Sequence, residues 1–430
     1  MNYSQRLHHV IPGGAHTYSR GDDQFPSNAP HLFKRGKGAY LYTANEESFL
    51  DYGMGLRAVT LGYAEERVLD AAMRQAMFGN NLTRASLVEL EAAEAFVALI
   101  PGADMVKFAK NGSNATTAAV KIARAYTKRK YIARCQDHPF LSFDDWFIGD
   151  TPVERGIPRE HHSLTLHFRY NDIQSVEELF SAYPDQIAGV ILEPATVAHP
   201  ENCFLHKLQE TCHKKGALFI LDEMITGFRW HLQGAQTYYE LEPDLSTFGK
   251  GVANGFSVAA VTGKREFMEI GGIKNVGEEK FFFTSTTNGA EMCGMGALLE
   301  TIDFYKENNV VEHLWHYGEQ LIEGMNAIAC ELGISDFFQV GGVPCSPLYT
   351  TRNKAGKACL GMRTLFAQEM VKEKILMPWI ALSYAHGKNE LERTLDATRK
   401  ALSVYVDALD AGYERFVIGD VIKPVFRKYI

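Results

Sequence analysis

Short apolar runs that do not alternate with polar residues recur through the middle of this chain. Ile187–Leu192 and residues 217–221 have this composition, and Met105–Ala109 is also predicted as a strand. Residues 115–126 and 205–215 carry apolar positions at helical spacing. A strand reads as a continuous apolar run when helices cover both faces of its sheet. The succession of such strands and helices along the chain therefore predicts an α/β domain built on a mainly parallel sheet.

Charge and cysteine content narrow the class of partner. The chain has 44 Lys and Arg against 52 Asp and Glu, a net charge of −8, which argues against nucleic acid or an anionic membrane as partner. No apolar run is long enough to cross a bilayer, and the N-terminus lacks the features of a secretory signal. The seven cysteines contain no CxxC pair, so neither a disulfide framework nor a metal site is predicted. We expect a cytoplasmic protein that acts on small molecules.

The first motif with chemical potential is Asn111-Gly112-Ser113, between a predicted strand and a predicted helix. Free backbone N–H groups and the positive end of the helix dipole suit a phosphate at such a position. A strand-to-helix turn also needs a glycine and a capping side chain for structural reasons alone. The motif by itself leaves both interpretations open.

Two further motifs carry ionisable side chains. Asp222 follows an apolar strand, at the sheet edge where parallel α/β proteins bind ligands, although an Asp there also serves as a turn residue. Lys250 stands between Gly249 and Gly251, which let a ligand approach an amine able to form a Schiff base. The alternative is a solvated lysine on a glycine-rich turn.

The order of the three motifs favours one cofactor over the separate structural interpretations. Pyridoxal 5'-phosphate (PLP) needs a helix N-terminus for its phosphate, a carboxylate for its ring nitrogen and a lysine for its aldehyde. A phosphate-type turn, then Asp222, then Lys250 supplies these groups in turn. The sequence therefore predicts a PLP enzyme.

Here the chain resembles the class III aminotransferases of PLP fold type I, and most closely their glutamate-1-semialdehyde aminomutase branch. The resemblance implies a large domain with a seven-stranded, mixed but mostly parallel sheet covered by helices, and a smaller α+β C-terminal domain. It is carried by residues 11–14, 38–42, 51–52, 193–194, 221–229, 243–245 and 248–250.

Roles follow from this resemblance residue by residue. Lys250 matches the lysine that forms the aldimine with PLP, and Asp222 matches the partner of the pyridine nitrogen. The remaining matches are the phosphate turn (Asn111, Gly112 and Ser113), a residue near the ring (Glu193), the histidine of the ring-stacking motif (His138), a threonine that reaches the phosphate of the other subunit (Thr284), and an arginine that holds a substrate carboxylate (Arg20). The match of Thr284 implies a homodimer with shared active sites.

Departures from the family pattern concern the substrate more than the cofactor. The ring-stacking motif reads Asp137-His138-Pro139, so Phe140 is an alternative stacking residue. Arg57 stands where the aminomutases have part of a Trp-Gly-Pro run, and becomes a second candidate for binding an anionic group. The acid of the aminomutase substrate pocket has no counterpart near residues 385–386.

These departures favour a transaminase that moves an amino group from a donor, by default glutamate, to an aldehyde or keto acceptor. The aminomutase itself is the main alternative, followed by racemisation or decarboxylation on the same scaffold. A non-catalytic regulatory protein is a further alternative, although it has no chemical need for both Lys250 and Asp222.

Domain boundaries follow the same resemblance. We expect an N-terminal segment, residues 1–55, that joins the small domain and forms a wall of the active site. A large PLP-binding domain is expected over residues 56–295. A small C-terminal domain with a helical tail is expected over residues 296–430, where the helical patterns are long.

Overall fold

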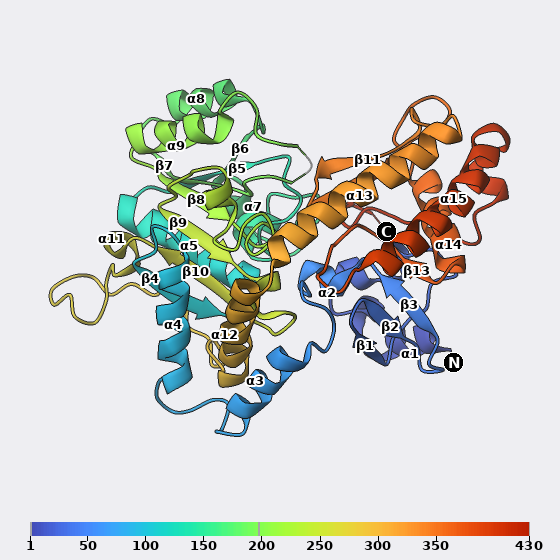
Figure 1. The fold of residues 1–430 in the computed structure, drawn as a ribbon. Coiled ribbons are helices and arrows are strands. Elements are labelled where there is room, and N and C mark those ends of the chain that lie inside the picture. The colour runs from blue at the N-terminus through green and yellow to red at the C-terminus, as the bar shows by residue number, and fades with distance from the viewer. Residues whose placement is uncertain (1, 197, 430) are drawn as a thin grey trace. The chain divides into compact units, whose positions relative to one another are not determined.

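The computed structural model describes residues 2–196 and 198–429, which form two compact units (Figure 1). The small unit comprises the N-terminal residues up to Glu65 together with Glu312–Arg427. The large unit comprises Glu66–Val311 and the short stretch after Arg427. The compact units divide after Glu65 and after Val311, while functional boundaries after residues 55 and 295 stay predictions.

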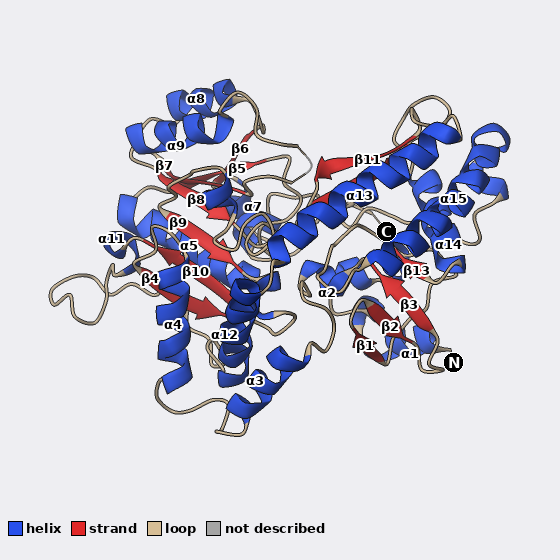
Figure 2. Ribbon diagram, in the orientation of Figure 1, coloured by secondary structure: helices blue, strands red, loops and turns tan. Residues whose placement is uncertain are grey.

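A seven-stranded sheet with strand order β4-β10-β9-β8-β7-β5-β6 forms the centre of the large unit (Figure 2). Five neighbouring strands, from β9 to β6, run parallel, and β10 lies antiparallel between β4 and β9. The mixed, mostly parallel sheet implied by the resemblance is confirmed. The strands are β4 (Met105–Ala109), β5 (Tyr131–Cys135), β6 (Thr165–Phe168), β7 (Ile187–Leu192), β8 (Leu218–Asp222), β9 (Leu245–Phe248) and β10 (Ala259–Gly263).

Helices cover the sheet, with α5 packed against β9 and β10, and α8 and α9 packed together beside β6 and β8. Figure 2 shows these helices in blue around the red strands. The helices of this unit are α3 (Glu66–Ala76), α4 (Leu87–Leu99), α5 (Gly112–Thr127), α6 (Asp145–Ile148), α7 (Arg159–His162), α8 (Ile173–Ala182), α9 (Phe204–Lys214), α10 (Ala235–Tyr238), α11 (Arg265–Met268) and α12 (Met292–Glu307).

Burial explains why the apolar runs form the inner strands. Every residue of β7 and of β8 is buried, because helices and neighbouring strands enclose both. The strands predicted at residues 105–109 and 187–192 coincide with β4 and β7. The strand predicted at residues 217–221 lies one residue later, so Asp222 is the last residue of β8.

The small unit combines a four-stranded sheet, in the order β1-β2-β3-β13, with a two-stranded antiparallel sheet, β11 and β12. It is therefore α+β, as expected. Its strands are β1 (Arg35–Lys37), β2 (Tyr40–Tyr42), β3 (Ser48–Asp51), β11 (Phe338–Val343), β12 (Ser346–Thr351) and β13 (Ile375–Leu376). Its helices are α1 (Tyr3–Val10), α2 (Met54–Arg57), α14 (Leu360–Lys372) and α15 (Lys388–Ala411), and α13 (Val310–Glu331) begins at the boundary between the units.

The short element α2 is a left-handed turn. The φ angles of Met54, Gly55, Leu56 and Arg57 are 39°, 58°, 64° and 68°, in a region that costs a non-glycine residue about 1 kcal/mol or more. Asp51, the last residue of β3, offsets that cost with its buried carboxylate. The carboxylate accepts hydrogen bonds from the N–H of Gly53 at 2.7 Å and the N–H of Met54 at 2.9 Å.

The C-terminal tail lies within the small unit. A single 3-10 turn, Tyr413–Arg415, follows α15, and the later described residues have no helix, whereas the sequence suggested a helical tail. Backbone N–H groups of the tail bond to side chains of α14, Ile418 to Gln368 and Ile422 to Thr364. Side-chain partners of this kind replace the hydrogen bonds that a helix would make internally.

Within the described ranges, no helix combines the length and apolar character needed to cross a membrane.

Candidate functional site

Most of the predicted cofactor residues meet at one edge of the large sheet. Lys250, Asp222, Glu193 and His138 come at or just after the carboxyl ends of β9, β8, β7 and β5, which are successive neighbours in the sheet. Asn111 follows β4, which runs in the same direction because two antiparallel pairings separate it from β9. Ligands of open α/β sheets bind at this edge.

Asp222 is held in a buried position by its neighbours. The carboxylate Oδ1 accepts hydrogen bonds from the N–H of Met224 at 3.0 Å and from the hydroxyl of Thr247 at 3.1 Å. Burial raises the pKa of Asp222, and the positive charge of Lys250 opposes that rise. An aspartate and a lysine therefore lie close enough to interact, on adjacent strand ends.

Lys250 adopts a strained backbone conformation. Its φ is 48°, in the left-handed region, and it begins the 3-10 turn Lys250–Ala253. A non-glycine residue in this region persists only where the surrounding structure fixes it. A Cβ on the residue before it, Gly249, would lie 2.6 Å from Met224 Sδ, so the Met224 side chain would have to shift to admit it.

The predicted phosphate turn is the start of α5. Asn111 is the N-cap, and its side chain accepts a hydrogen bond from the N–H of Asn114 at 3.0 Å. Helix geometry leaves the N–H groups of Gly112 and Ser113 without intrahelical acceptors. A Cβ on Gly112 would lie 2.9 Å from Met224 Sδ, the same atom that lies beside Gly249. The Met224 side chain therefore lies between this turn and the turn that carries Lys250.

His138 is fixed as a hydrogen-bond donor. It is 2% exposed, and its Nδ1 accepts a hydrogen bond from the N–H of Glu193 at 3.0 Å. With Nδ1 accepting, the proton lies on Nε2, which has no partner among the described residues. Burial lowers the pKa of His138 from 6.5 to about 4, so the ring is neutral near pH 7.

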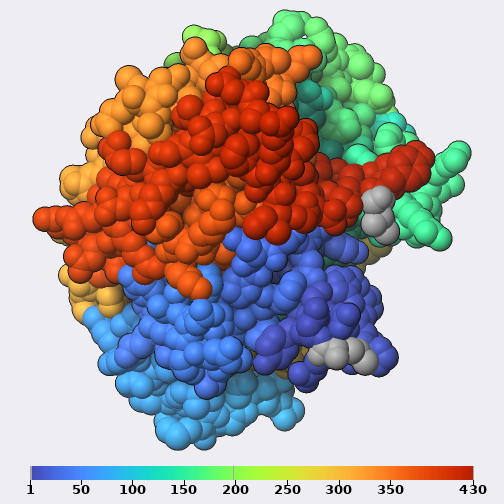
Figure 3. Space-filling model, turned by 90° about the vertical axis from the view of Figure 1, so that its right-hand side faces the viewer, coloured from blue at the N-terminus to red at the C-terminus, as the bar shows by residue number. Residues whose placement is uncertain are grey.

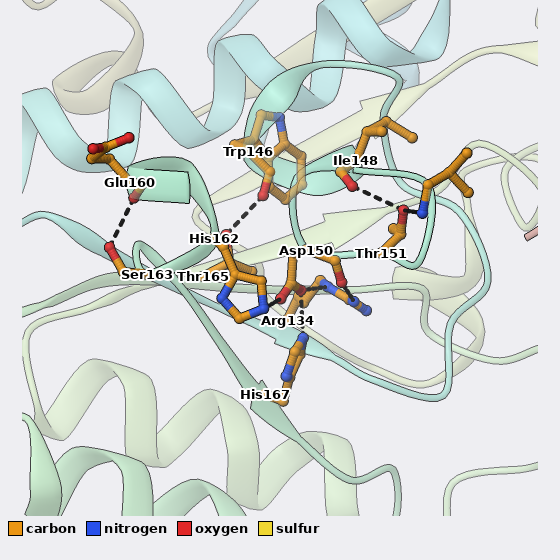
Figure 4. A network of polar contacts seen from close by, with 11 residues as sticks. Arg134, Trp146, Ile148, Asp150, Thr151, Glu160, His162, Ser163, Thr165 and His167 are labelled. Carbon is orange, nitrogen blue, oxygen red and sulfur yellow. Dashed lines mark hydrogen bonds and ion pairs between the residues drawn. The ribbon is translucent and has the colours of Figure 1, made fainter. Parts of the chain in front are cut away.

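A polar network beside β5 holds the segment that follows His138 (Figure 4). Arg134 donates from Nε to Asp150 Oδ2 at 2.8 Å, and both side chains are buried. His167 of β6 bonds to the same carboxylate, and His162 of α7 lies 3.7 Å from its other oxygen. The Ser113 hydroxyl accepts from the N–H of Phe143 at 2.9 Å, which ties this segment to α5.

The two aromatic candidates for ring stacking differ in exposure. His138 is buried, whereas Phe140 is 46% exposed and meets Phe147 edge-on at 5.7 Å. Which of them faces the cofactor ring stays a prediction.

Thr284 lies in the extended segment between α11 and α12. In that segment the Phe282 carbonyl accepts a hydrogen bond from Lys121 Nζ of α5 at 3.2 Å. Farther along, Gly289 approaches the carbonyl of Phe108 in β4. The segment therefore passes beside the strand and helix that form the phosphate turn.

Arg57 belongs to the small unit. The guanidinium of Arg57 donates from Nη1 to the Ser346 hydroxyl at 2.9 Å and to the Ile380 carbonyl at 3.1 Å. These bonds fix the side chain at the end of the left-handed turn.

Arg20 also belongs to the small unit and is exposed. Its positive charge acts on Tyr63, whose hydroxyl donates to Asp51 at 2.7 Å and accepts from the N–H of Gly55 at 2.8 Å. Burial raises the pKa of Tyr63 and the charge of Arg20 opposes the rise. Arg20 therefore lies near the hydrogen-bond network of the left-handed turn.

The large-unit arrangement fits a ligand that carries a phosphate, a basic aromatic ring and a carbonyl group. The start of α5 offers N–H donors for the phosphate, and Asp222 offers a carboxylate for the ring. Lys250 offers an amine for the carbonyl group. The Nε2 donor of buried His138 adds a polar group that has no partner within the part of the chain that the structure describes.

Comparison with known proteins places this fold among the type I PLP-dependent enzymes. The structure superposes on the FumI protein of Sphingopyxis sp. MTA144, solved in its PLP internal aldimine form, with a TM-score of 0.86 and 27% identity, covering 94% of this chain and 96% of that one. An omega-transaminase from Sphaerobacter thermophilus superposes with a TM-score of 0.82 and 25% identity, covering 94% and 97%.

Residues 23–342 match the family model described as Aminotransferase class-III. A glutamate-1-semialdehyde 2,1-aminomutase of Sulfurihydrogenibium azorense is 32% identical over 407 residues, 87% of this chain and 92% of that protein. A 3-aminobutyryl-CoA aminotransferase of Cloacimonas acidaminovorans is 28% identical over 415 residues, 94% and 96% of the two chains. The chain belongs to the class III aminotransferase family.

Sequence reasoning gave no role to Met224 or Thr247. Met224 contacts both glycine turns, and Thr247 bonds to Asp222 from the paired position on β9. The one available signal for Thr247 was its place three residues before Lys250, on the short strand that precedes it. Nothing in the local sequence distinguishes a thioether that fills the space between two turns.

Proposed function

We propose that this chain is a transaminase that moves an amino group from an amino donor to an aldehyde or keto acceptor. The cofactor is pyridoxal 5'-phosphate. The observation that carries the proposal is the placement of Lys250 and Asp222 on the ends of adjacent parallel strands, with electrostatic interaction between them. An amine and a buried carboxylate so placed are the two groups that amine transfer on this cofactor requires.

Each cofactor residue has an assigned part in this proposal. Gly112 and Ser113 bind the phosphate through their N–H groups, with Asn111 capping the helix behind them. Asp222 binds the protonated ring nitrogen. The neutral side chain of His138 and the carboxylate of Glu193 lie beside the ring, where the Nε2–H of His138 is available to donate.

Lys250 has the central catalytic part. The bound cofactor supplies an electron-withdrawing ring that stabilises negative charge on the carbon next to the transferred amine. Lys250 Nζ would hold the carbonyl end of the cofactor in the resting enzyme. Once an amino donor had taken its place, the Lys250 amine would accept a proton as general base and return it as general acid.

Arg20 and Arg57 are assigned to an anionic group of donor or acceptor. A guanidinium can bind a carboxylate through two parallel hydrogen bonds. Arg57 is fixed by Ser346 and Ile380, and the side chain of Arg20 is exposed. We therefore expect substrates with a carboxylate or comparable anion, and glutamate is the donor to test first.

The aminomutase reaction is the second candidate, favoured by the named relatives that are glutamate-1-semialdehyde 2,1-aminomutases. It moves the amine within one substrate and needs no separate acceptor. A turnover assay with and without an added keto acid separates the two reactions.

A homodimer with shared active sites is part of the same proposal. Apolar side chains gather on α3 and on the segment leading to α4 while remaining exposed: Leu69, Met73, Met77, Phe78, Leu82 and Leu87. Large exposed apolar surface of this kind marks association sites. We assign to this contact the approach of Thr284 to the phosphate of the second subunit, and sedimentation equilibrium of the loaded enzyme tests it. Placement in the cytoplasm likewise stays a prediction.

The experiment that tests the proposed function is a donor scan of the loaded enzyme by absorption spectroscopy. A single amino donor should convert the cofactor to its amine form, and added keto acid should reverse the change. Lys250→Ala should abolish both the visible band of the resting enzyme and turnover. Transamination by that variant, or a wild-type spectrum that no donor and no aminomutase substrate changes, would contradict the proposal.

A further inference from the structure

The short segment that carries Arg20 is anchored on two sides by consecutive acidic residues. Arg20 ends the 3-10 turn Tyr18–Arg20, and a second turn, Asp22–Gln24, follows after Gly21. Asp22 accepts hydrogen bonds from Ser4 at 2.5 Å and from His8 at 3.2 Å, both on α1. One anchor of the segment is therefore the N-terminal helix.

The second anchor is the C-terminal tail. Arg427 donates from Nη2 to Asp23 Oδ2 at 2.5 Å, and the N–H of Lys423 donates to the Asp23 carbonyl at 2.9 Å. Gln24 returns a hydrogen bond from its Nε2 to the Lys423 carbonyl at 2.9 Å. In the space-filling view of Figure 3, these C-terminal residues (red) lie directly against the N-terminal residues (blue).

The tail is itself fixed along its length to the body of the small unit. Gln368 of α14 accepts from the N–H of Ile418 at 2.7 Å and donates to the Phe416 carbonyl at 3.0 Å. Close packing continues at Gly419, where a Cβ would lie 2.2 Å from Ser27 Oγ. The tail thus connects a long helix to the segment that carries Arg20.

We propose that the tail from Ile418 to Arg427 is a strap that positions Arg20 for substrate, and that Arg427 is a positioning residue. The inference rests on the proposed function of Arg20 as an anion-binding residue. The exposed Arg20 side chain has a defined location only if the backbone around it is fixed. The hydrogen bonds made by Asp22 and Asp23 fix that backbone. A flexible arginine loses more conformational entropy when it binds a carboxylate, so its affinity is lower.

Hydrogen exchange of the full-length, PLP-loaded protein tests the strap directly. Arg427→Gln should accelerate exchange of the amides of residues 18–24 relative to wild type. Arg415→Gln is the matched control, because Arg415 is an exposed tail arginine and makes no hydrogen bond to that segment. Unchanged exchange in Arg427→Gln would overturn the proposal.

Steady-state kinetics with the carboxylate donor that changes the spectrum test the functional part. Since the pair between Arg427 and Asp23 is partly exposed, Arg427→Gln should raise KM by about twofold to fivefold, with kcat and the cofactor spectrum unchanged. Arg427→Lys should recover part of the change. Asp23→Asn should raise KM similarly, and the double variant should not exceed either single variant.

Arg20→Gln separates a failure of the strap from a failure of the role assigned to Arg20. If Arg20→Gln raises KM and Arg427→Gln does not, the strap is wrong while the assignment of Arg20 stands. If Arg20→Gln leaves KM unchanged, the role of Arg20 fails, and the strap fails as a substrate-positioning device whatever the exchange data show.

Discussion

Thr247 on β9 stands directly opposite Asp222 on β8 and donates its hydroxyl hydrogen to Asp222 Oδ1 at 3.1 Å. This bond stabilises the ionised carboxylate in a position where burial favours the protonated form. The neighbouring strand thereby helps to keep Asp222 charged for the ring nitrogen of the cofactor.

Asp222→Asn should lower kcat by about 100-fold to 1000-fold, the range found when one electrostatic group is removed from an active site. Thr247→Val should lower it by about tenfold, because Asp222 keeps its charge and loses one of its hydrogen bonds. The measurement is single-turnover conversion of the loaded enzyme by an amino donor. Thr262→Val is the control, since the hydroxyl of Thr262 bonds to the Met105 carbonyl. Equal losses in the Thr247 and Thr262 variants would contradict the role of Thr247.

His138 should make the folded protein sensitive to mild acid. Its pKa is about 4 in the folded state and 6.5 without burial, so the unfolded state binds more protons between these values. The contribution of His138 to the free energy of unfolding is therefore fully present above pH 6.5. It is lost as the pH falls towards 4, which lowers the free energy of unfolding by up to about 3 kcal/mol. Denaturant unfolding at a series of pH values should show this slope, and His138→Asn should reduce it. The exposed His9 is the control, and an equal change in His9→Asn would refute the assignment.

Gly249→Ala should weaken the cofactor site through steric contact alone. The new methyl group would lie 2.6 Å from Met224 Sδ, and such overpacking typically costs about 1–3 kcal/mol. Met224→Ala in the same chain should recover most of that loss, because it empties the space. PLP titration followed by absorption measures the effect. Gly341→Ala, which has open space around its Cβ position, should leave affinity unchanged. A double variant as weak as Gly249→Ala would show that contact with Met224 is not the cause.

Asp51→Asn should destabilise the small unit. The buried carboxylate accepts from two backbone N–H groups and from the Tyr63 hydroxyl, and an amide cannot serve all three. Loss of one buried partner costs about 1–3 kcal/mol. Thermal unfolding should show a lower transition than for Asp420→Asn, whose residue is exposed. Equal transitions for the two variants would mean that the left-handed turn does not depend on Asp51.

The parts of the fold that the sequence could predict are those that burial controls. The continuous apolar runs at β7 and β8 identified inner strands, whereas β4 lies at one side of the sheet. A residue at the carboxyl end of an inner parallel strand must lie at the ligand edge. The edge position of Asp222 followed from this rule. The start of α5 was predicted three residues late, because capping by Asn111 extends a helix beyond its apolar pattern.

Other features depend on contacts that are distant in sequence. The antiparallel insertion of β10 is invisible in its own residues, because a buried strand has the same apolar character in either direction. The left-handed turn at residues 54–57 rests on Asp51 and Tyr63, and only one of its four residues is a glycine. The tail forms no further helix because its hydrogen bonds go to α14 and to Asp23, partners that no local pattern shows.

The position of β10 between β4 and β9 has a consequence for how the protein folds. In the sheet, only β10 lies between β4, which precedes the phosphate turn, and β9, which precedes Lys250, and β10 follows both in the chain. The two turns therefore come together only once β10 has paired with both strands. A growing or half-folded chain presents no complete cofactor site. We therefore expect PLP to be captured only after β10 has joined the sheet, so that the absorption of the bound cofactor reports this late step of folding.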